Sequence, residues 1–164
     1  MNSKIITDIC CVMGRMVIAG NMRRSAMLAM GKSDDEMFVD LKNYLIFPDR
    51  IEYGYCTNNS ITIDQNLDEH KHIIKRIKQN GEPGLLFMDN IRRYGRMQNR
   101  ADSKDFHKII GGNACAEITL RSYELCNLSE VFWNRIDTLD EFLDVLKYAF
   151  LVCKIVSKYY RNQC

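Results

Sequence analysis

The sequence predicts an α/β fold, in which helices alternate with short buried strands. Segments with apolar residues at helical spacing alternate along the chain with short apolar or β-branched runs bounded by glycine and asparagine. No internal repeat is present, and 46% hydrophobic and 27% charged residues are ordinary for a globular protein. A chain of 164 residues suggests a single domain that can bury a core of its own.

The first part of the chain predicts a helix, a strand and a second helix. Residues Ile5–Ile18 are apolar at helical spacing and stop before a Gly-Asn pair at 20–21, which is typical of a helix C-terminus. The short apolar run Ala26–Met30 fits a buried strand, although the end of a helix has the same pattern. Ser33, followed by three acidic residues, is typical of an N-cap, and we expect its helix to reach about Lys42.

The middle of the chain predicts two strands, each followed by a helix. The stretch Tyr53–Asp64 is rich in aromatic and β-branched residues and is predicted as a strand. A helix is expected from about Leu67 to Gln79, because an Asn-Gly pair and then a proline follow it. Leu85–Met88 is a third candidate strand, and the charged residues Asp89–Asp102 are predicted as a helix followed by a loop.

The last part of the chain predicts a loop, two short strands and a long helix. A glycine pair and Asn113 open the loop, and Glu117–Leu120 and Leu125–Val131 are predicted as strands. The run Thr138–Glu141 has the pattern of a capping box, ahead of an amphipathic helix that reaches about Tyr160. A parallel sheet covered by helices needs more strands than these. We therefore expect residues 1–164 to be a fragment of a larger domain.

Charge and composition exclude several classes of function. The net charge is +2 with both signs interspersed, which gives no reason to expect nucleic acid or an anionic membrane as a partner. No run approaches the roughly 20 apolar residues of a membrane span, and the N-terminus lacks the apolar core of a secretion signal. Seven cysteines without a CxxC pair argue against a disulfide scaffold and a zinc site, and favour a reducing, cytoplasmic setting. The three histidines show no ligand spacing, so no metal site is predicted.

The least ordinary stretch of the sequence is Asn113–Ile118, which follows the glycine pair. Cys115 stands between two alanines, so its thiol can come close to a bound molecule. In an extended segment, alternate residues point to one face, and we therefore expect Asn113, Cys115 and Glu117 to converge on one substrate. They supply a hydrogen-bonding amide, a nucleophilic or one-electron sulfur, and a general base. On this pattern alone, a buried structural thiol is the commoner outcome.

Several segments together resemble the ribonucleotide reductase family. The runs Asn113–Ile118 and Glu124–Val131 are similar to its active-site signature, and further similar segments occur in the family's order. These segments are Gly20–Ala26, Asn58–Ser60, Gly81–Gly84 and Arg93–Met97. The resemblance covers about Asp8 to Ala149. It implies a ten-stranded α/β barrel with Asn-x-Cys-x-Glu at the tip of a finger loop, of which residues 1–164 would be a partial catalytic barrel domain.

The spacing of two cysteines resembles one class within that family. Cys126 lies eleven residues after Cys115, as in the adenosylcobalamin-dependent class, whereas the iron- or manganese-dependent class generally has a longer insertion. The resemblance implies that Cys115 becomes a thiyl radical, by means of adenosylcobalamin, and removes the 3′ hydrogen of a ribonucleotide. It also implies that Glu117 takes the 3′-hydroxyl proton, that Asn113 bonds the ribose, and that Cys126 is one of two reducing thiols.

Further expectations follow from the same resemblance. Asn58, Asn59 and Ser60 are weaker candidates for substrate contacts, since they could instead bond the backbone of their own strand. The implied partners are a ribonucleoside triphosphate or diphosphate, with the triphosphate favoured, a thioredoxin-like reductant, and the remaining parts of the reductase. The cofactor would be bound mainly by segments that this chain lacks.

Departures from the family pattern leave two alternatives. Ala114 stands where the family usually has proline, which costs preorganisation but no catalytic group. No cysteine matches the family's other reducing thiol, and we expect the chain alone to be inactive.

One alternative is a fragment of an iron-dependent reductase or a glycyl-radical enzyme, against which Glu117 and the cysteine spacing argue. The other is a degenerate, non-catalytic fragment that only associates with partner chains, which the joint retention of Asn113, Cys115, Glu117 and Cys126 disfavours.

Overall fold

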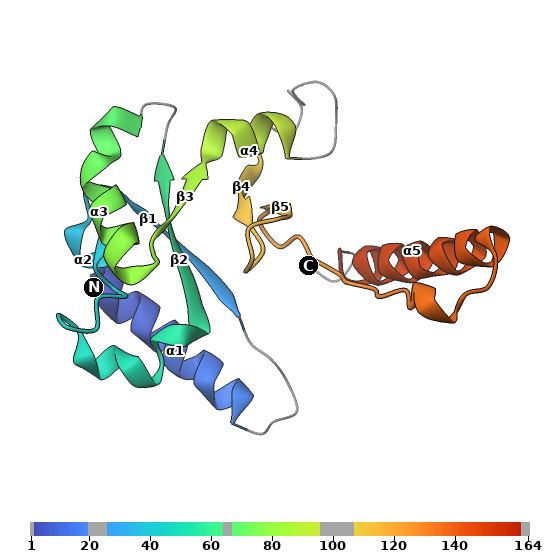
Figure 1. The fold of residues 1–164 in the computed structure, drawn as a ribbon, viewed down its shortest axis with the longest axis horizontal. Helices are drawn as coiled ribbons and strands as arrows, with labels where there is room; N and C mark the ends of the chain where they lie inside the picture. Colours follow the sequence, from blue (N-terminus) through green and yellow to red (C-terminus); the bar gives the residue numbers. More distant parts are fainter. Residues whose placement is uncertain (1, 20–25, 64–66, 96–106, 162–164) are drawn as a thin grey trace. The chain divides into compact units, whose positions relative to one another are not determined.

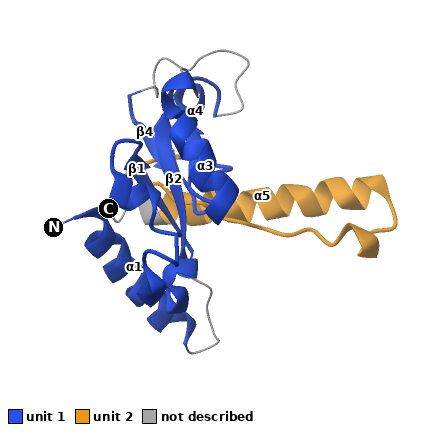
Figure 2. Cartoon of the chain, turned by 60° about the vertical axis from the view of Figure 1, so that its left-hand side comes forward, with its two compact units in different colours: residues 1–119 blue, residues 120–164 orange. Residues whose placement is uncertain are grey.

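The computed structural model describes residues 2–19, 26–63, 67–95 and 107–161. They fall into two compact units, unit 1 (Met1–Thr119) and unit 2 (Leu120–Cys164), which Figure 2 distinguishes by colour. Helices and strands alternate in unit 1, so the predicted α/β class is confirmed.

The centre of unit 1 is a three-stranded parallel sheet in the order β1–β2–β3 (Figure 1). Its strands are β1 (Met27–Lys32), β2 (Thr57–Ile63) and β3 (Gly84–Phe87). Met27 lies opposite Thr57, and Ser60 lies opposite Gly84. Parallel neighbours require crossover connections, and the helices between the strands are part of those connections.

The first and third helices of unit 1 each have a clear cap at one end. The side chain of Asn2 accepts a hydrogen bond from the backbone N–H of Ile5 and begins the first helix. Gly81 ends the third helix in the left-handed conformation, with φ of 78°. The helices are α1 (Ser3–Ile18), α2 (Glu36–Val39), α3 (Lys71–Asn80) and α4 (Met88–Tyr94), with short 3₁₀ turns η1 (Pro48–Glu52), η2 (Gly54–Cys56) and η3 (Leu67–His70).

The two faces of β2 have different surroundings, because successive side chains of a strand point to opposite sides. The odd-numbered side chains face the helices, where Ile61 and Ile63 belong to the buried core. We call this the helix face. Even-numbered residues, Asn58 and Ser60 among them, face the other way, and we call that side the loop face. The core on the helix face is completed by Phe38, Val39, Leu41 and Ile73.

Several predicted boundaries in unit 1 are wrong. The helix expected from Ser33 to Lys42 spans only Glu36–Val39, because β1 extends to Lys32 and Asp35 is the residue that accepts from the N–H of Phe38. The strand expected from Tyr53 begins at Thr57, since residues 54–56 form the turn η2. The predictions for α1, β1, α3, β3 and α4 are confirmed within a few residues.

Unit 2 consists of an irregular segment, the turn η4 (Trp133–Arg135) and the helix α5 (Leu139–Arg161). The predicted capping box is confirmed, because the N–H of Glu141 donates to Thr138 Oγ1 over 3.2 Å and its carboxylate accepts from Asp137 N. The strand predicted at Leu125–Val131 is wrong: these residues have no regular structure. Among the described helices, none combines the length and apolar character needed to cross a bilayer.

Candidate active site

The segment that carries Cys115 joins two short strands, β4 (Ile109–Gly112) and β5 (Thr119–Arg121), which form a separate two-stranded sheet. We call Asn113–Ile118 the finger loop. The glycine pair expected to open this loop is instead part of β4, and its first member packs on the sheet. A Cβ atom at Gly111 would lie 2.5 Å from the terminal methyl carbon of Met30, so a larger residue here would require the end of the Met30 side chain to move.

The finger loop is a tight turn, and the expectation of an extended segment was wrong. The N–H of Ala116 donates to the carbonyl of Asn113 over 2.9 Å, and the N–H of Asn113 donates to the carbonyl of Ile118 over 3.0 Å. Ala116 has φ of 63°, in the left-handed region that closes such turns. The chain therefore reverses direction at Cys115, whose side chain is exposed.

The turn brings two of the three predicted site residues together. The amide nitrogen of Asn113 donates to Glu117 Oε1 over 2.5 Å, and its amide oxygen accepts from the N–H of Ile118 over 3.0 Å. Both ends of the amide are thus used to hold the carboxylate beside the loop backbone. Asn113 and Glu117 meet because the chain turns between them, and the exposed Cys115 lies within the same turn.

The finger loop lies over the loop face of the sheet. The amide nitrogen of Asn58 donates to the carbonyl of Ala114 over 2.7 Å, and Gly111 packs on Met30 of β1. At the other end of β4, Ile110 lines a cavity together with Thr62, near the end of β2. β4 therefore runs along the sheet in the direction opposite to β2, and the loop reaches the start of that strand.

The three weaker candidates on β2 are separated by the strand. Asn58 and Ser60 point to the loop face, whereas Asn59 points to the helix face and is only 2% exposed. The backbone N–H of Asn59 donates to Glu82 Oε2 over 2.9 Å, and its side-chain amide has no hydrogen-bond partner among the described residues. The period of two in a strand is a signal that could have separated these residues in advance.

The second predicted thiol lies in unit 2. Cys126 is half-buried in the irregular segment before η4. The next residue, Asn127, donates from its amide to Ser157 Oγ of α5 over 2.6 Å. Ser129 Oγ lies 3.1 Å from Cys153 Sγ, also on α5. These side chains attach the segment to α5 in place of the strand pairing that the sequence suggested.

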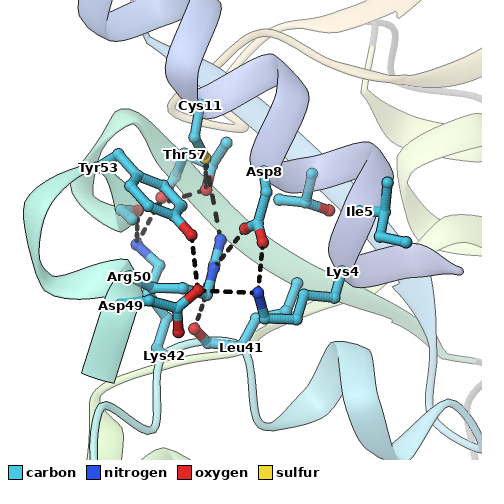
Figure 3. Close-up of polar contacts among 12 residues, drawn as sticks. Lys4, Ile5, Asp8, Cys11, Leu41, Lys42, Asp49, Arg50, Tyr53 and Thr57 are labelled. Atoms are coloured by element: carbon cyan, nitrogen blue, oxygen red, sulfur yellow. Dashed lines mark hydrogen bonds and ion pairs between the residues drawn. The ribbon is translucent and has the colours of Figure 1, made fainter. Parts of the chain in front are cut away.

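A buried ionic cluster near Thr57, the first residue of β2, was not predicted from the sequence (Figure 3). Arg50 is fully buried; its Nε donates to Asp8 Oδ1 over 2.7 Å, and its Nη1 donates to the carbonyl of Leu41. Asp8 also accepts from Lys4 over 2.6 Å, and this hydrogen bond is the main cause that raises the pKa of Lys4. The cluster joins α1 to η1, and no motif in the sequence marks it.

The outer part of the same cluster is a second acid and a phenol. Tyr53 donates to Asp49 Oδ2 over 2.9 Å, and Asp49 also accepts from Lys4 over 3.1 Å. The bonds from Lys4 and Tyr53 lower the pKa of Asp49. Burial, and then the bond to Asp49, raise the pKa of Tyr53 to about 12.

A cationic side chain fixes the backbone at the start of β2. Lys42 Nζ donates to the carbonyl of Gly54 over 2.8 Å and to that of Thr57 over 2.6 Å. It also lies 3.4 Å from Glu82 Oε2, the oxygen that accepts from Asn59 N. The backbone on both sides of Asn58 is therefore held by buried or half-buried polar contacts.

A cavity of about 510 Å³ lies at the carboxyl ends of the parallel strands. Its charged lining is mixed: Lys32 and Arg92 face it together with Asp34 and Glu69. Within the described ranges, no group of histidine, cysteine or acidic side chains is arranged to hold a metal ion. The motif positions Gly20–Ser25, Arg96 and Met97 lie outside the described residues, and Cys164 does as well.

Comparison with known proteins decides the family. The model of the family "Ribonucleotide reductase, barrel domain" matches residues 53–163, which include β2, β3 and the finger loop. The chain belongs to the ribonucleotide reductase barrel-domain family. The comparison with solved structures found no significant match.

Three curated relatives are similar to this chain. A "Probable adenosylcobalamin-dependent ribonucleoside-triphosphate reductase" of Dictyostelium discoideum is 42% identical over 158 residues, 96% of this chain and 21% of that protein. An adenosylcobalamin-dependent ribonucleoside-triphosphate reductase of Euglena gracilis is 41% identical, over 93% of this chain and 21% of that protein. One of Lacticaseibacillus paracasei is 38% identical, over 77% of this chain and 17% of that protein. The chain thus spans about a fifth of the length of these relatives.

Proposed function

We propose that this chain is a segment of an adenosylcobalamin-dependent ribonucleoside-triphosphate reductase, a cytoplasmic enzyme that converts ribonucleotides to 2′-deoxyribonucleotides. The names of the three relatives support the cobalamin class over the iron-dependent class. In the complete enzyme, β1–β3 and the finger loop would form part of a closed ten-stranded barrel. The segment alone would be inactive, because it holds only part of the catalytic groups.

One observation carries the proposal: the turn that joins Asn113 to Glu117 exposes a thiol between them. Cys115 is exposed, and its two neighbours in sequence, Ala114 and Ala116, have small side chains that leave its sulfur accessible. The Asn113–Glu117 hydrogen bond holds an amide and a carboxylate beside the same turn. A sugar ring placed over this turn would meet a hydrogen-atom acceptor, a proton acceptor and a hydrogen-bond donor together.

The proposed chemistry assigns one task to each group. The sulfur radical of Cys115 takes the hydrogen atom from C3′ and later returns it. Glu117 accepts the proton of the 3′-hydroxyl while the 2′-hydroxyl, protonated, leaves as water. Two electrons and the needed protons come from the thiols of Cys126 and of a second cysteine elsewhere in the reductase, which become a disulfide. A thioredoxin-like reductant then reduces that disulfide.

The exposed sulfur of Cys115, between two alanines, fits the need of a radical cofactor to approach it. When bound, adenosylcobalamin supplies the one-electron oxidation that converts the thiol to a radical. Asn113 and Glu117 orient the ribose, and the barrel excludes water from the turn. The residues that hold the cofactor itself would lie mainly in other segments of the reductase.

The test replaces Cys115 with serine in the full-length reductase that contains this segment. Cys115→Ser should abolish formation of deoxyribonucleotide from a ribonucleoside triphosphate, because serine cannot carry the radical. The control, Cys10→Ser, changes a half-buried thiol on α1 and should leave the rate within about twofold. Activity that survives Cys115→Ser would remove the radical assignment. If the full-length protein without any substitution is inactive, the degenerate, non-catalytic alternative for this chain is favoured.

A further inference from the structure

We propose that Asn58 is a positioning residue for Cys115, rather than a ligand of the substrate. Its amide nitrogen donates to the carbonyl of Ala114 over 2.7 Å. Ala114 immediately precedes Cys115, so this bond fixes the peptide that carries the thiol. The proposal rests on the proposed function for its catalytic meaning, but the contact itself is a property of this chain.

The anchor is suited to this task because the backbone of Asn58 is itself held on both sides. The carbonyl of Thr57 accepts from Lys42 Nζ over 2.6 Å, and the N–H of Asn59 donates to Glu82 Oε2 over 2.9 Å. Lys42 and Glu82 pair with each other at 3.4 Å. Because its backbone is fixed, the Asn58 side chain can hold the Ala114 carbonyl at a defined place relative to the sheet.

The finger loop needs an anchor of this kind. Its internal hydrogen bonds define the shape of the turn but not its position over the sheet. Two contacts between the described residues join the sheet to this part of the chain: Gly111 packs against Met30 and places β4, and Asn58 bonds Ala114 and places the turn. The two contacts are separated along the loop face, so together they fix both the position and the direction of the finger.

This arrangement also explains why an asparagine suits the position. The contact needs a donor, because the group on the finger is a carbonyl. An aspartate of the same shape would place a carboxylate against that carbonyl and repel it. A leucine of similar size would fill the space and lose the hydrogen bond, so the two variants separate shape from donation.

The first experiment uses the 164-residue chain and needs no activity. Hydrogen–deuterium exchange of the N–H groups of Asn113, Ala116 and Ile118, which are bonded within the finger loop, is compared among variants. Asn58→Leu and Asn58→Asp should raise exchange at these groups by roughly three- to tenfold, the range expected for one net hydrogen bond. Exchange at Ile61 and Ile63, in the core, should stay unchanged.

The control for this experiment is Thr62→Val. Thr62 lies on the same face of β2, and its hydroxyl donates to the carbonyl of Gly31 over 3.4 Å, away from the finger. This variant should leave exchange in the finger loop as it is in the unchanged chain. Unaltered exchange in both Asn58 variants would overturn the proposal, and so would an equal rise throughout β2, which indicates general destabilisation.

The second experiment separates an anchor from a substrate ligand in the full-length reductase. Asn58→Leu should lower kcat by about tenfold or more with KM nearly unchanged, because a displaced thiol slows chemistry without weakening binding. A rise in KM at unchanged kcat would identify Asn58 as a substrate ligand and overturn the proposal. If the full-length protein is inactive altogether, the exchange experiment still decides whether Asn58 anchors the finger.

Discussion

Removing Asp8 should destabilise the fold far more than removing an exposed acid from the same pair of elements. Arg50 is fully buried, and Asp8, whose side chain is 16% exposed, is its carboxylate partner at 2.7 Å. Breaking a buried pair from one side costs about 3–5 kcal/mol, because the remaining charge stays buried without compensation. The carbonyl of Leu41 still accepts from Arg50, so we expect Asp8→Ala to lower the free energy of unfolding by about 3 kcal/mol.

The matched control is Glu52→Ala. Glu52 and Arg15 also join η1 to α1, with a 3.0 Å ion pair, but their side chains are 73% and 50% exposed. An exposed pair contributes only about 0–1 kcal/mol. Urea denaturation of the 164-residue chain, monitored by circular dichroism, gives both free-energy changes. The comparison requires that the variants share the same dependence of unfolding free energy on urea concentration. Equal losses for the two variants would refute the reasoning.

A double variant tests the cause of the loss. Asp8→Leu combined with Arg50→Met replaces both charges with apolar groups and leaves neither uncompensated. Such replacements are often neutral or stabilising, so the double variant should recover most of the stability that Asp8→Ala loses. A double variant as unstable as the single one would show that packing, and not the unpaired guanidinium, is responsible.

Two further predictions concern the pH dependence and a helix end. The pKa of Tyr53 is raised from 10.0 to about 12, because burial and the bond to Asp49 favour the protonated phenol in the folded chain. The contribution of Tyr53 to stability is fully present below about pH 10 and is lost as pH rises through about 12. Urea midpoints should therefore fall more steeply over this range for the chain without substitution than for Tyr53→Phe. Equal pH dependence of the two midpoints would contradict this. Gly81 ends α3 at φ of 78°, and no atom of the described residues lies within 4 Å of the place where a Cβ would stand. Gly81→Ala should therefore cost about 1 kcal/mol from backbone strain alone, whereas Gln79→Ala should cost nothing measurable in thermal denaturation.

The local pattern of apolar residues was enough to predict the helices and strands that bury one regular face. The helices α1 and α3 and the strands β1 and β3 were expected from apolar spacing and end signals, and the cap at Thr138 from its side-chain chemistry. These features depend on neighbours a few residues apart, which a single sequence displays directly.

Features that depend on distant partners were not predictable. Arg50 is polar and follows a proline and an aspartate, so its sequence context suggests an exposed turn, yet Asp8 and Leu41 surround it. The segment Leu125–Val131 has strand-like residues, but its polar side chains bond α5 instead. The finger loop was expected from its glycines and resemblance, while its turn was missed because alanine rarely adopts a left-handed φ such as that of Ala116.

The division of β2 into two faces limits how this part of the chain can change in length. Inserting or deleting one residue between Thr57 and Ile63 would exchange the faces of all residues beyond the change. Isoleucines would then emerge beside the finger, and polar side chains would enter the hydrophobic core. Such a change would damage folding and the reactive turn in one step, whereas point substitutions can alter either property while sparing the other.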